Sequence, residues 1–263
     1  MKENRFKKFW TKVNSFVDKI LFPDDIKCLF CGKDVSDFEN KPYCDECEKE
    51  IEFNKGNRCI ICDEPIDNEA IVCDNCQKNK RFFKRAFCPF LYSGKVRTAI
   101  LGYKDSNQRY KAKTFSKYIA NRIQESGVEI DCVTYVPLTK KKLRERSFNQ
   151  AELLAKEIAK ILNIEVLSIF EKTKDVYGQK FSNFKERQAN MKDLYKLIST
   201  KLDKEKNYLI VDDIITTGAT VNYCAGLIEK KVKNVYVCAI ARNKRRHKFS
   251  QEESASYNRF ENQ

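Results

Sequence analysis

Two kinds of apolar pattern alternate along the last two-thirds of the chain. Short, nearly continuous apolar runs bounded by polar residues are typical of strands buried on both faces. They predict strands at residues 87–92, 131–137, 208–211 and 235–241. Apolar residues three and four positions apart predict amphipathic helices. These occur at residues 96–103, 111–124, 149–162 and 221–230. Because strands and helices alternate, the sequence predicts an α/β fold whose mostly parallel sheet is flanked by helices.

The other segments of the chain have different patterns. Apolar positions in residues 1–23 form one stripe of a predicted amphipathic helix, which can pack on the rest of the protein or lie on a membrane surface. Residues 24–82 hold few aliphatic residues, so we expect this small domain to depend on metal for its fold. Residues 86–242 form the α/β domain. Residues 243–263 form a basic, polar tail that we expect to be disordered.

Eight of the twelve cysteines lie in four C-x-x-C pairs. The pairs are Cys28/Cys31, Cys44/Cys47, Cys59/Cys62 and Cys73/Cys76. Each pair places two thiolates on one side of a tight turn, and two turns complete a tetrahedral shell. We interpret consecutive pairs as two structural zinc sites in a double zinc ribbon; a cross-brace pairing and redox-active C-x-x-C motifs are the alternatives. The other four cysteines have apolar neighbours and are expected to pack in the core: Cys88, Cys132, Cys224 and Cys238.

The formal net charge of the chain is +14, which favours polyanionic partners. Part of this charge lies near the two ends, where a solvated basic tail and a nucleic-acid contact are both consistent with it. No apolar run is long enough to cross a bilayer, and the first residues lack the pattern of a signal peptide. We therefore expect a cytoplasmic protein without an integral membrane segment.

The most informative segment joins the predicted strand 208–211 to the helix that begins near residue 221. Two carboxylates, Asp212 and Asp213, follow the strand and can accept hydrogen bonds from a sugar diol. A small, hydroxyl-rich turn comes next, made of Thr216, Thr217, Gly218, Ala219 and Thr220. Backbone N–H groups, hydroxyls and the positive end of the helix can hold a phosphate in such a turn. The alternative is an ordinary buried strand with an Asp-capped turn.

A second polar segment connects the strand 131–137 to the helix 149–162. It holds five basic residues, Lys140, Lys141, Lys142, Arg144 and Arg146. The positive electrostatic potential of these residues suits a pyrophosphate, although a solvated basic loop has the same composition. Elsewhere, phenylalanines between basic residues at 81–87 can stack on nucleic-acid bases or pack in the core.

The sequence LIVDDIITTGAT at 209–220 resembles the motif by which type I phosphoribosyltransferases bind phosphoribosyl pyrophosphate (PRPP). The resemblance implies that Asp212 and Asp213 hold the ribose hydroxyls and orient the sugar for catalysis. It implies that residues 216–220 cradle the 5-phosphate. It also implies Mg²⁺ as a companion of PRPP, shared largely with ligand oxygens and water.

The segment VPL…R…RSFNQAELLA resembles the signature of the ComF family, whose members are linked to DNA uptake in competent bacteria. The resemblance covers roughly residues 20–242, with Ser147 where glycine is usual. It implies that one cleft is bordered by Lys104, Arg144, Arg146, Asn149, Gln179 and Arg187. Arg146 and Arg187 are the residues we expect to contact pyrophosphate or another polyanion, because arginine forms bidentate contacts with such groups.

Three functions are compatible with these features. The chain can be a PRPP-binding competence factor that handles single-stranded DNA. It can be an active phosphoribosyltransferase whose acceptor is unidentified. It can also be a PRPP-sensing adaptor that binds a protein partner, such as a DNA-uptake helicase, through its zinc domain. The sole histidine, His247, lies in the predicted tail and is a poor candidate for a general base.

Overall fold

The architecture follows from a computed structural model, which describes residues 27–35, 41–66, 69–105, 108–174, 194–199 and 201–243. The predicted helix at 1–23 lies outside these residues. So do Gln179, Arg187 and the predicted tail beyond residue 243.

The centre of the protein is a five-stranded sheet in which every pair of neighbouring strands is parallel. Its strands, in spatial order, are β1 (Arg85–Phe87), β9 (Asn234–Cys238), β7 (Asn207–Val211), β3 (Cys132–Tyr135) and β4 (Glu165–Val166). The middle strand, β7, is buried along its whole length. This arrangement confirms the predicted α/β fold with a parallel sheet.

Three of these strands break and then resume. The resumed strands form a small parallel sheet in the order β2 (Phe90–Leu91), β10 (Ala241–Arg242) and β8 (Ile214–Ile215), which repeats the order of β1, β9 and β7. The predicted strands 87–92 and 235–241 are therefore each two short strands. Pro89 contributes to the first break because it has no N–H to donate to the ladder. The break after β7 is the position of the Asp212–Asp213 pair.

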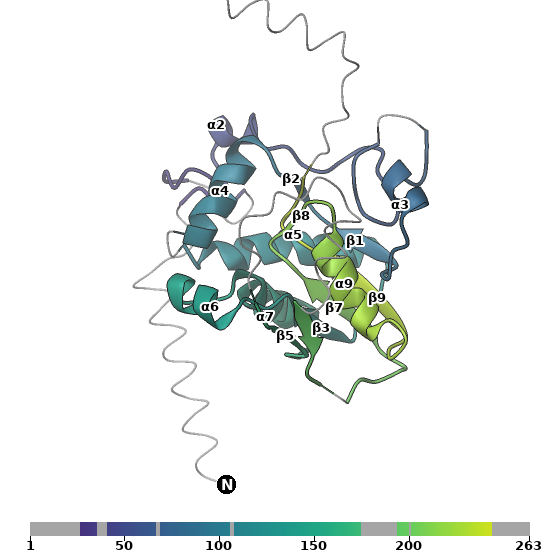
Figure 1. Ribbon diagram of the computed structural model, residues 1–263. Coiled ribbons are helices and arrows are strands. Elements are labelled where there is room, and N and C mark those ends of the chain that lie inside the picture. Colours follow the sequence, from purple (N-terminus) through teal and green to yellow (C-terminus); the bar gives the residue numbers. More distant parts are fainter. Residues whose placement is uncertain are drawn as a thin grey trace, which may run out of the picture.

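Helices cover both faces of the sheet (Figure 1). The larger described helices are α4 (Gly94–Asp105), α5 (Lys111–Glu125), α6 (Lys140–Arg146), α7 (Gln150–Leu162) and α9 (Ala219–Ile228). Helices α5 and α7 pack against each other on one face, and α9 packs on β7 and β9 from the other. A short antiparallel pair, β5 (Phe170–Lys172) and β6 (Tyr195–Leu197), lies beside α9.

Alternate residues of β7 belong to two separate hydrophobic cores. Leu209 and Val211 pack with residues of α5 and α7, whereas Tyr208 and Ile210 pack with residues of α9. Successive side chains of a strand point to opposite faces, so a continuous apolar run fills both cores. This is why the run at 208–211 has no polar alternation.

The cysteine-rich segment is part of both cores. Its short helices are α2 (Asp45–Glu48) and α3 (Asp74–Lys78), which lie well apart at one end of the molecule (Figure 1). Cys28 and Cys47 join the core beside α5, and Cys59 and Cys62 join the core beside α9. The two cysteine units thus pack against opposite faces of the sheet. Both hydrophobic cores continue across the predicted domain boundary near residue 82.

The four cysteines outside the C-x-x-C pairs are all buried, as predicted. Phe83 and Phe87 are buried too, so they pack in the core and the base-stacking interpretation of residues 81–87 is wrong for both. Among the helices that the structure describes, none combines the length and apolar character needed to cross a membrane.

Candidate functional site

The acidic pair, Asp212 and Asp213, lies at the carboxyl end of the central strand β7, where ligands bind in open parallel sheets. The N–H of Asp212 donates to the Cys238 carbonyl at 2.9 Å, and the N–H of Ile240 donates to the Asp213 carbonyl at 3.1 Å. The backbone of the pair is therefore held by the neighbouring strand, and both residues are half-buried.

The two carboxylates have different partners. Asp213 forms an ion pair with Lys104 of α4, with 2.8 Å between Oδ2 and Nζ. Asp212 accepts a hydrogen bond from the Asp213 N–H at 2.8 Å. Burial, and then the charge of Asp213, raise the pKa of Asp212 to about 7. One acid is thus paired with a cation, and the other titrates near neutral pH.

The turn after β8 has the form expected of an anion-binding loop. Gly218 adopts a left-handed conformation with φ of 77° and precedes α9 directly, so it begins the helix. The Thr217 hydroxyl accepts a hydrogen bond from the Ala219 N–H at 3.3 Å. Thr216 is exposed, and Thr217 and Thr220 are half-buried, so all three hydroxyls lie at or near the surface.

A chain of contacts joins the basic helix α6 to the acidic pair. Arg146, at the end of α6, lies 3.5 Å from the Gln150 side-chain oxygen. The amide of Gln150 donates to the Lys104 carbonyl at 3.1 Å, and Lys104 pairs with Asp213. The structure therefore connects two of the predicted site residues, Lys104 and Arg146, with the acidic pair.

Two other predicted site residues have different surroundings. Arg144 is exposed on α6, and no described contact joins it to the acidic pair. Asn149 caps α7: its side-chain oxygen accepts from the Ala151 N–H at 3.0 Å, and its amide donates to the Val136 carbonyl at 3.0 Å. Asn149 thus fixes the direction in which the chain enters α7.

Three residues beside the loop were missed in the sequence. Arg242, the last residue of the predicted α/β domain, is fully buried, and its Nη1 donates to the carbonyls of Ile215 and Thr216. Its Nη2 donates to Glu64 at 3.1 Å. Arg81 lies so near Gly218 that a Cβ there would be 3.4 Å from its Nη1. A signal for Arg242 was its place directly after a predicted strand, at the same sheet edge as Asp212.

The eight paired cysteines form two clusters, and in each the four sulfur atoms lie within 4.8 Å of one another. Cys28, Cys31, Cys44 and Cys47 make the first cluster; Cys59, Cys62, Cys73 and Cys76 make the second. The predicted grouping of consecutive pairs is confirmed, and the cross-brace alternative is wrong. Four cysteine sulfurs at such distances can hold a structural zinc ion.

Cations beside the clusters fit zinc tetrathiolate, which carries a net negative charge. The Arg81 Nε donates to the Cys76 sulfur at 3.3 Å, and the Arg242 Nη2 donates to the Cys62 sulfur at 3.8 Å. Near the first cluster, burial lowers the pKa of Lys111 to about 8, while the charge of Cys28 acts in the opposite direction. Buried cations of this kind balance an anionic centre.

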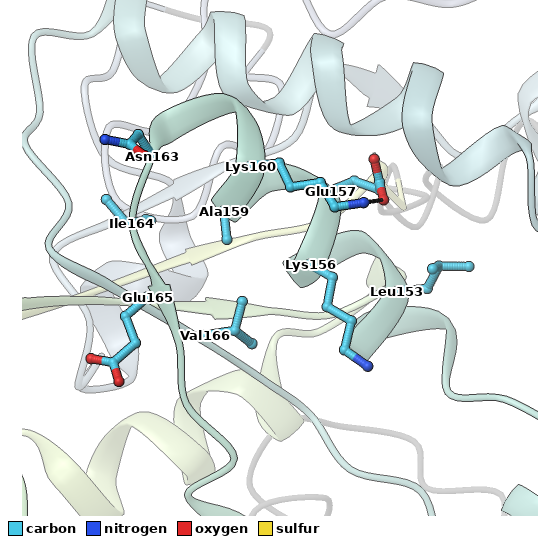
Figure 2. A pocket seen from close by; sticks show the side chains of 9 residues that line it. All are labelled: Leu153, Lys156, Glu157, Ala159, Lys160, Asn163, Ile164, Glu165 and Val166. Carbon is cyan, nitrogen blue, oxygen red and sulfur yellow. Dashed lines mark hydrogen bonds and ion pairs between the residues drawn. The ribbon is translucent and has the colours of Figure 1, made fainter. Parts of the chain in front are cut away.

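A separate hollow of about 630 Å³ lies between the C-terminal half of α7 and the edge strand β4 (Figure 2). Figure 2 shows Lys156, Glu157 and Lys160 along one side of it and Val166 on another. None of the predicted site residues lines this hollow. The candidate site is therefore the sheet edge with the acidic pair and the loop.

Fold and site together define an α/β protein with a parallel central sheet, an acidic pair and a loop–helix unit at the carboxyl edge of that sheet, and a cysteine-rich N-terminal region. No protein-family profile matches the chain. Among curated proteins, the chain is 27% identical to competence protein F of Haemophilus influenzae, over 82% of this chain and 90% of that protein. It is 24% identical to the DNA utilization protein YhgH of Escherichia coli K12, over 70% of this chain and 83% of that protein.

These relatives confirm the resemblance to the ComF family over most of the chain. Among solved structures, an adenine phosphoribosyltransferase aligns with 53% of this chain and 75% of its own, with a TM-score of 0.33 and 19% identity. The parallel strand order and the strand–loop–helix unit described above define the fold class.

Proposed function

We propose that this protein binds PRPP with Mg²⁺ at the edge of the central sheet and assists the handling of single-stranded DNA, as a phosphoribosyltransferase-like competence factor. One observation carries the proposal. The acidic pair ends the central strand beside Lys104, and the loop that follows opens a helix. A ribose 5-phosphate needs these two groups side by side.

Each group of the site has a separate task in this proposal. The carboxylates of Asp212 and Asp213 accept hydrogen bonds from the ribose hydroxyls. The N–H groups and hydroxyls of residues 216–220 hold the 5-phosphate at the N-terminus of α9. Lys104, Arg146 and Arg187 supply positive charge for the pyrophosphate. Magnesium, when bound, would neutralise phosphate charge and be coordinated mainly by ligand oxygens and water.

The DNA part of the proposal is supported by the exposed charge of α6 and by the relatives. Helix α6 buries none of its residues and carries Lys140, Lys141 and Arg144 on its surface. Exposed lysines attract the phosphate backbone without reading the sequence. The names of the curated relatives refer to competence and DNA utilization. A helicase partner and an adaptor role remain predictions.

The test of the PRPP site is a double substitution, Asp212→Ala with Asp213→Ala. We expect it to abolish PRPP binding in the presence of Mg²⁺, measured by titration calorimetry, because the ribose loses both of its acceptors. Retained far-ultraviolet circular dichroism and zinc content would show that the fold persists. Unchanged PRPP affinity would refute the assignment.

A screen of nucleobases and amines with PRPP, monitored by pyrophosphate release, separates a binding protein from an enzyme. Release that requires one added acceptor would identify a phosphoribosyltransferase. Absence of release with intact binding would support a regulatory or structural use of PRPP.

A further inference from the structure

Two arginines connect the second cysteine cluster with the proposed phosphate loop, residues 216–220, and with Ile215 just before it. Arg242 donates through Nη1 to the loop carbonyls of Ile215 and Thr216 and through Nη2 to Glu64 and Cys62. Arg81 donates to Cys76 and lies beside Gly218. Each guanidinium therefore has one side on the cysteine cluster and the other on residues 215–218.

The Arg242 contacts with Ile215, Cys62 and Glu64 are buried, so water does not weaken them, and the contact with the Thr216 carbonyl is partly buried. The side chain of Arg242 is 0% exposed and that of Glu64 is 7% exposed. Glu64 lies two residues after Cys62, and its Oε2 is 3.8 Å from the Cys73 sulfur. The position of the Glu64 carboxylate thus depends on the geometry of the cluster. A buried guanidinium without its carboxylate is strongly unfavourable.

The two carbonyl contacts of Arg242, together with the hydrogen bond that the Asn243 N–H donates to the Ile215 carbonyl at 2.9 Å, fix where the loop directs its N–H groups. In a trans peptide the C=O and the following N–H point in opposite directions, and no described peptide is cis. Carbonyls of Ile215 and Thr216 that point at Arg242 therefore direct the N–H groups of Thr216 and Thr217 away from it. Consecutive N–H groups on one side of a turn form an anion-binding concavity. Arg242 therefore lies on the opposite side of the loop from these N–H groups.

The start of α9 is attached to the same unit by a separate contact. The Asn222 side chain accepts from the Phe82 N–H at 2.8 Å and donates to the Lys80 carbonyl at 3.2 Å. Residues 80–82 follow Cys76 closely in sequence. No described contact of this kind joins the first cluster to the loop, since that cluster packs on the opposite face of the sheet.

We propose that Arg242 is a positioning residue of the phosphate loop, and that metal bound by Cys59, Cys62, Cys73 and Cys76 holds it in place through Glu64. The affinity of the loop for phosphate then depends on the occupancy of the second metal site and not of the first. This inference rests on the proposed PRPP site and adds a means of regulating it, since loss of this metal releases the loop.

The test compares zinc-loaded wild type with Glu64→Gln and Arg242→Lys. Glu64→Gln keeps the side-chain shape and removes the charge. Arg242→Lys keeps the charge and removes the guanidinium that contacts both the loop carbonyls and Glu64. The matched control is Glu46→Gln, which removes a carboxylate from the Lys33–Glu46 ion pair beside the first cluster. Two measurements are made: PRPP affinity with Mg²⁺ by calorimetry, and hydrogen-exchange protection of the amides at 214–220.

We expect Glu64→Gln and Arg242→Lys to weaken PRPP binding about tenfold, within the usual range of coupling between sites, and to reduce protection of the loop amides. Glu46→Gln should change neither quantity. A purely structural role would lower the melting temperature but leave the PRPP affinity of the folded protein unchanged. Unchanged affinity and protection in both variants would overturn the inference.

Failure of the proposed function gives a different result. If the wild type binds no PRPP, the proposed function is wrong. The role of Arg242 is then decided by the hydrogen-exchange protection of the loop amides alone. If either variant loses its zinc, the comparison is made on the wild-type protein instead, first stripped of zinc by a chelator and then reloaded with zinc. Loop protection that is the same with and without zinc would then overturn the coupling.

Discussion

At the scale of single residues, Asp212 and Asp213 are adjacent in the chain but have different surroundings. Asp213 is paired with Lys104 at 2.8 Å. The pKa of Asp212 is raised to about 7, mainly by burial and then by the charge of Asp213. Only an ionised carboxylate is a strong acceptor for both ribose hydroxyls. In the proposed PRPP site, the hydrogen bonding of the ribose by this pair therefore becomes complete only when Asp212 loses its proton.

PRPP affinity should consequently rise between pH 6 and 8 in the wild type. Below the pKa of about 7 Asp212 is largely protonated, and above it the carboxylate is ionised. Asp212→Asn stays neutral, so the two proteins should bind PRPP similarly near pH 6 and diverge near pH 8. Calorimetry at several pH values measures the ratio of the two affinities.

Taking this ratio removes the titration of the ligand phosphate, whose pKa of about 6 affects both proteins equally.

The pH dependence of stability independently checks the direction of the Asp212 pKa shift. A carboxyl whose folded pKa lies above its unfolded value of about 3.9 binds more protons in the folded state, so its contribution to stability falls from about pH 4 to pH 7. A pH-independent affinity ratio would contradict the role of Asp212.

Ser147 gives a second prediction at this scale. It follows α6 with φ of 64°, a left-handed conformation that costs a non-glycine residue about 1–2 kcal/mol. Glycine has no such cost but loses more chain entropy on folding, about 0.5–1 kcal/mol. Ser147→Gly should therefore raise the free energy of unfolding by about 0.5–1 kcal/mol in urea denaturation.

The control for Ser147 is Asn163→Gly at the end of α7, where φ is 55°. Asparagine tolerates this region well, so the gain there should be close to zero. Equal gains at both positions would mean that the strain at Ser147 is not what the substitution relieves.

At the scale of elements, α6 is the one described helix of the loop between β3 and α7. Thr139 caps it by accepting from the Lys142 N–H at 3.2 Å, and the helix buries none of its residues. Much of its positive charge therefore lies at the surface of the protein. The sequence located the basic residues of this loop, but it predicted no helix there, because the loop has no apolar periodicity.

The DNA proposal is tested on this helix. Lys140→Gln with Lys141→Gln should weaken binding of single-stranded DNA and reduce the slope of log affinity against log salt by about 1.4, since each phosphate contact contributes about 0.7. Lys230→Gln with Lys231→Gln, two exposed lysines just after α9, is the matched control. Fluorescence anisotropy at several salt concentrations measures both slopes. Equal losses from the two double variants would indicate non-specific attraction and not a site on α6.

At the scale of the whole molecule, the two cysteine units pack on opposite faces of one sheet. Cys28 and Cys47 are buried beside α5, and Cys59 and Cys62 are buried beside α9. We predict two zinc ions per chain by elemental analysis. Chelation should lower the melting temperature of the whole protein, because loss of either metal loosens a core that the sheet shares. One zinc per chain, or an unchanged melting temperature after full removal, would contradict this.

The sequence alone determined the parallel α/β fold, the four C-x-x-C pairs and the location of the acidic pair, because each depends on residues close together in the chain. The structure decided between the consecutive and the cross-brace grouping of the cysteine pairs. The run at 208–211 predicts a strand buried on both faces, and its end places Asp212 and Asp213 at the ligand-binding edge. Spacing of the C-x-x-C pairs predicts two four-sulfur clusters, and both are formed.

Only the tertiary structure decided how these parts are connected. Arg242 and Glu64 are 178 positions apart, and Phe82 and Asn222 are 140 apart. Nothing local in the sequence distinguishes a basic residue that pairs with a distant carboxylate from one that is solvated in a tail. The fold brings them together because the strand after α9 returns beside β7, placing Arg242 between the loop and the second cysteine cluster.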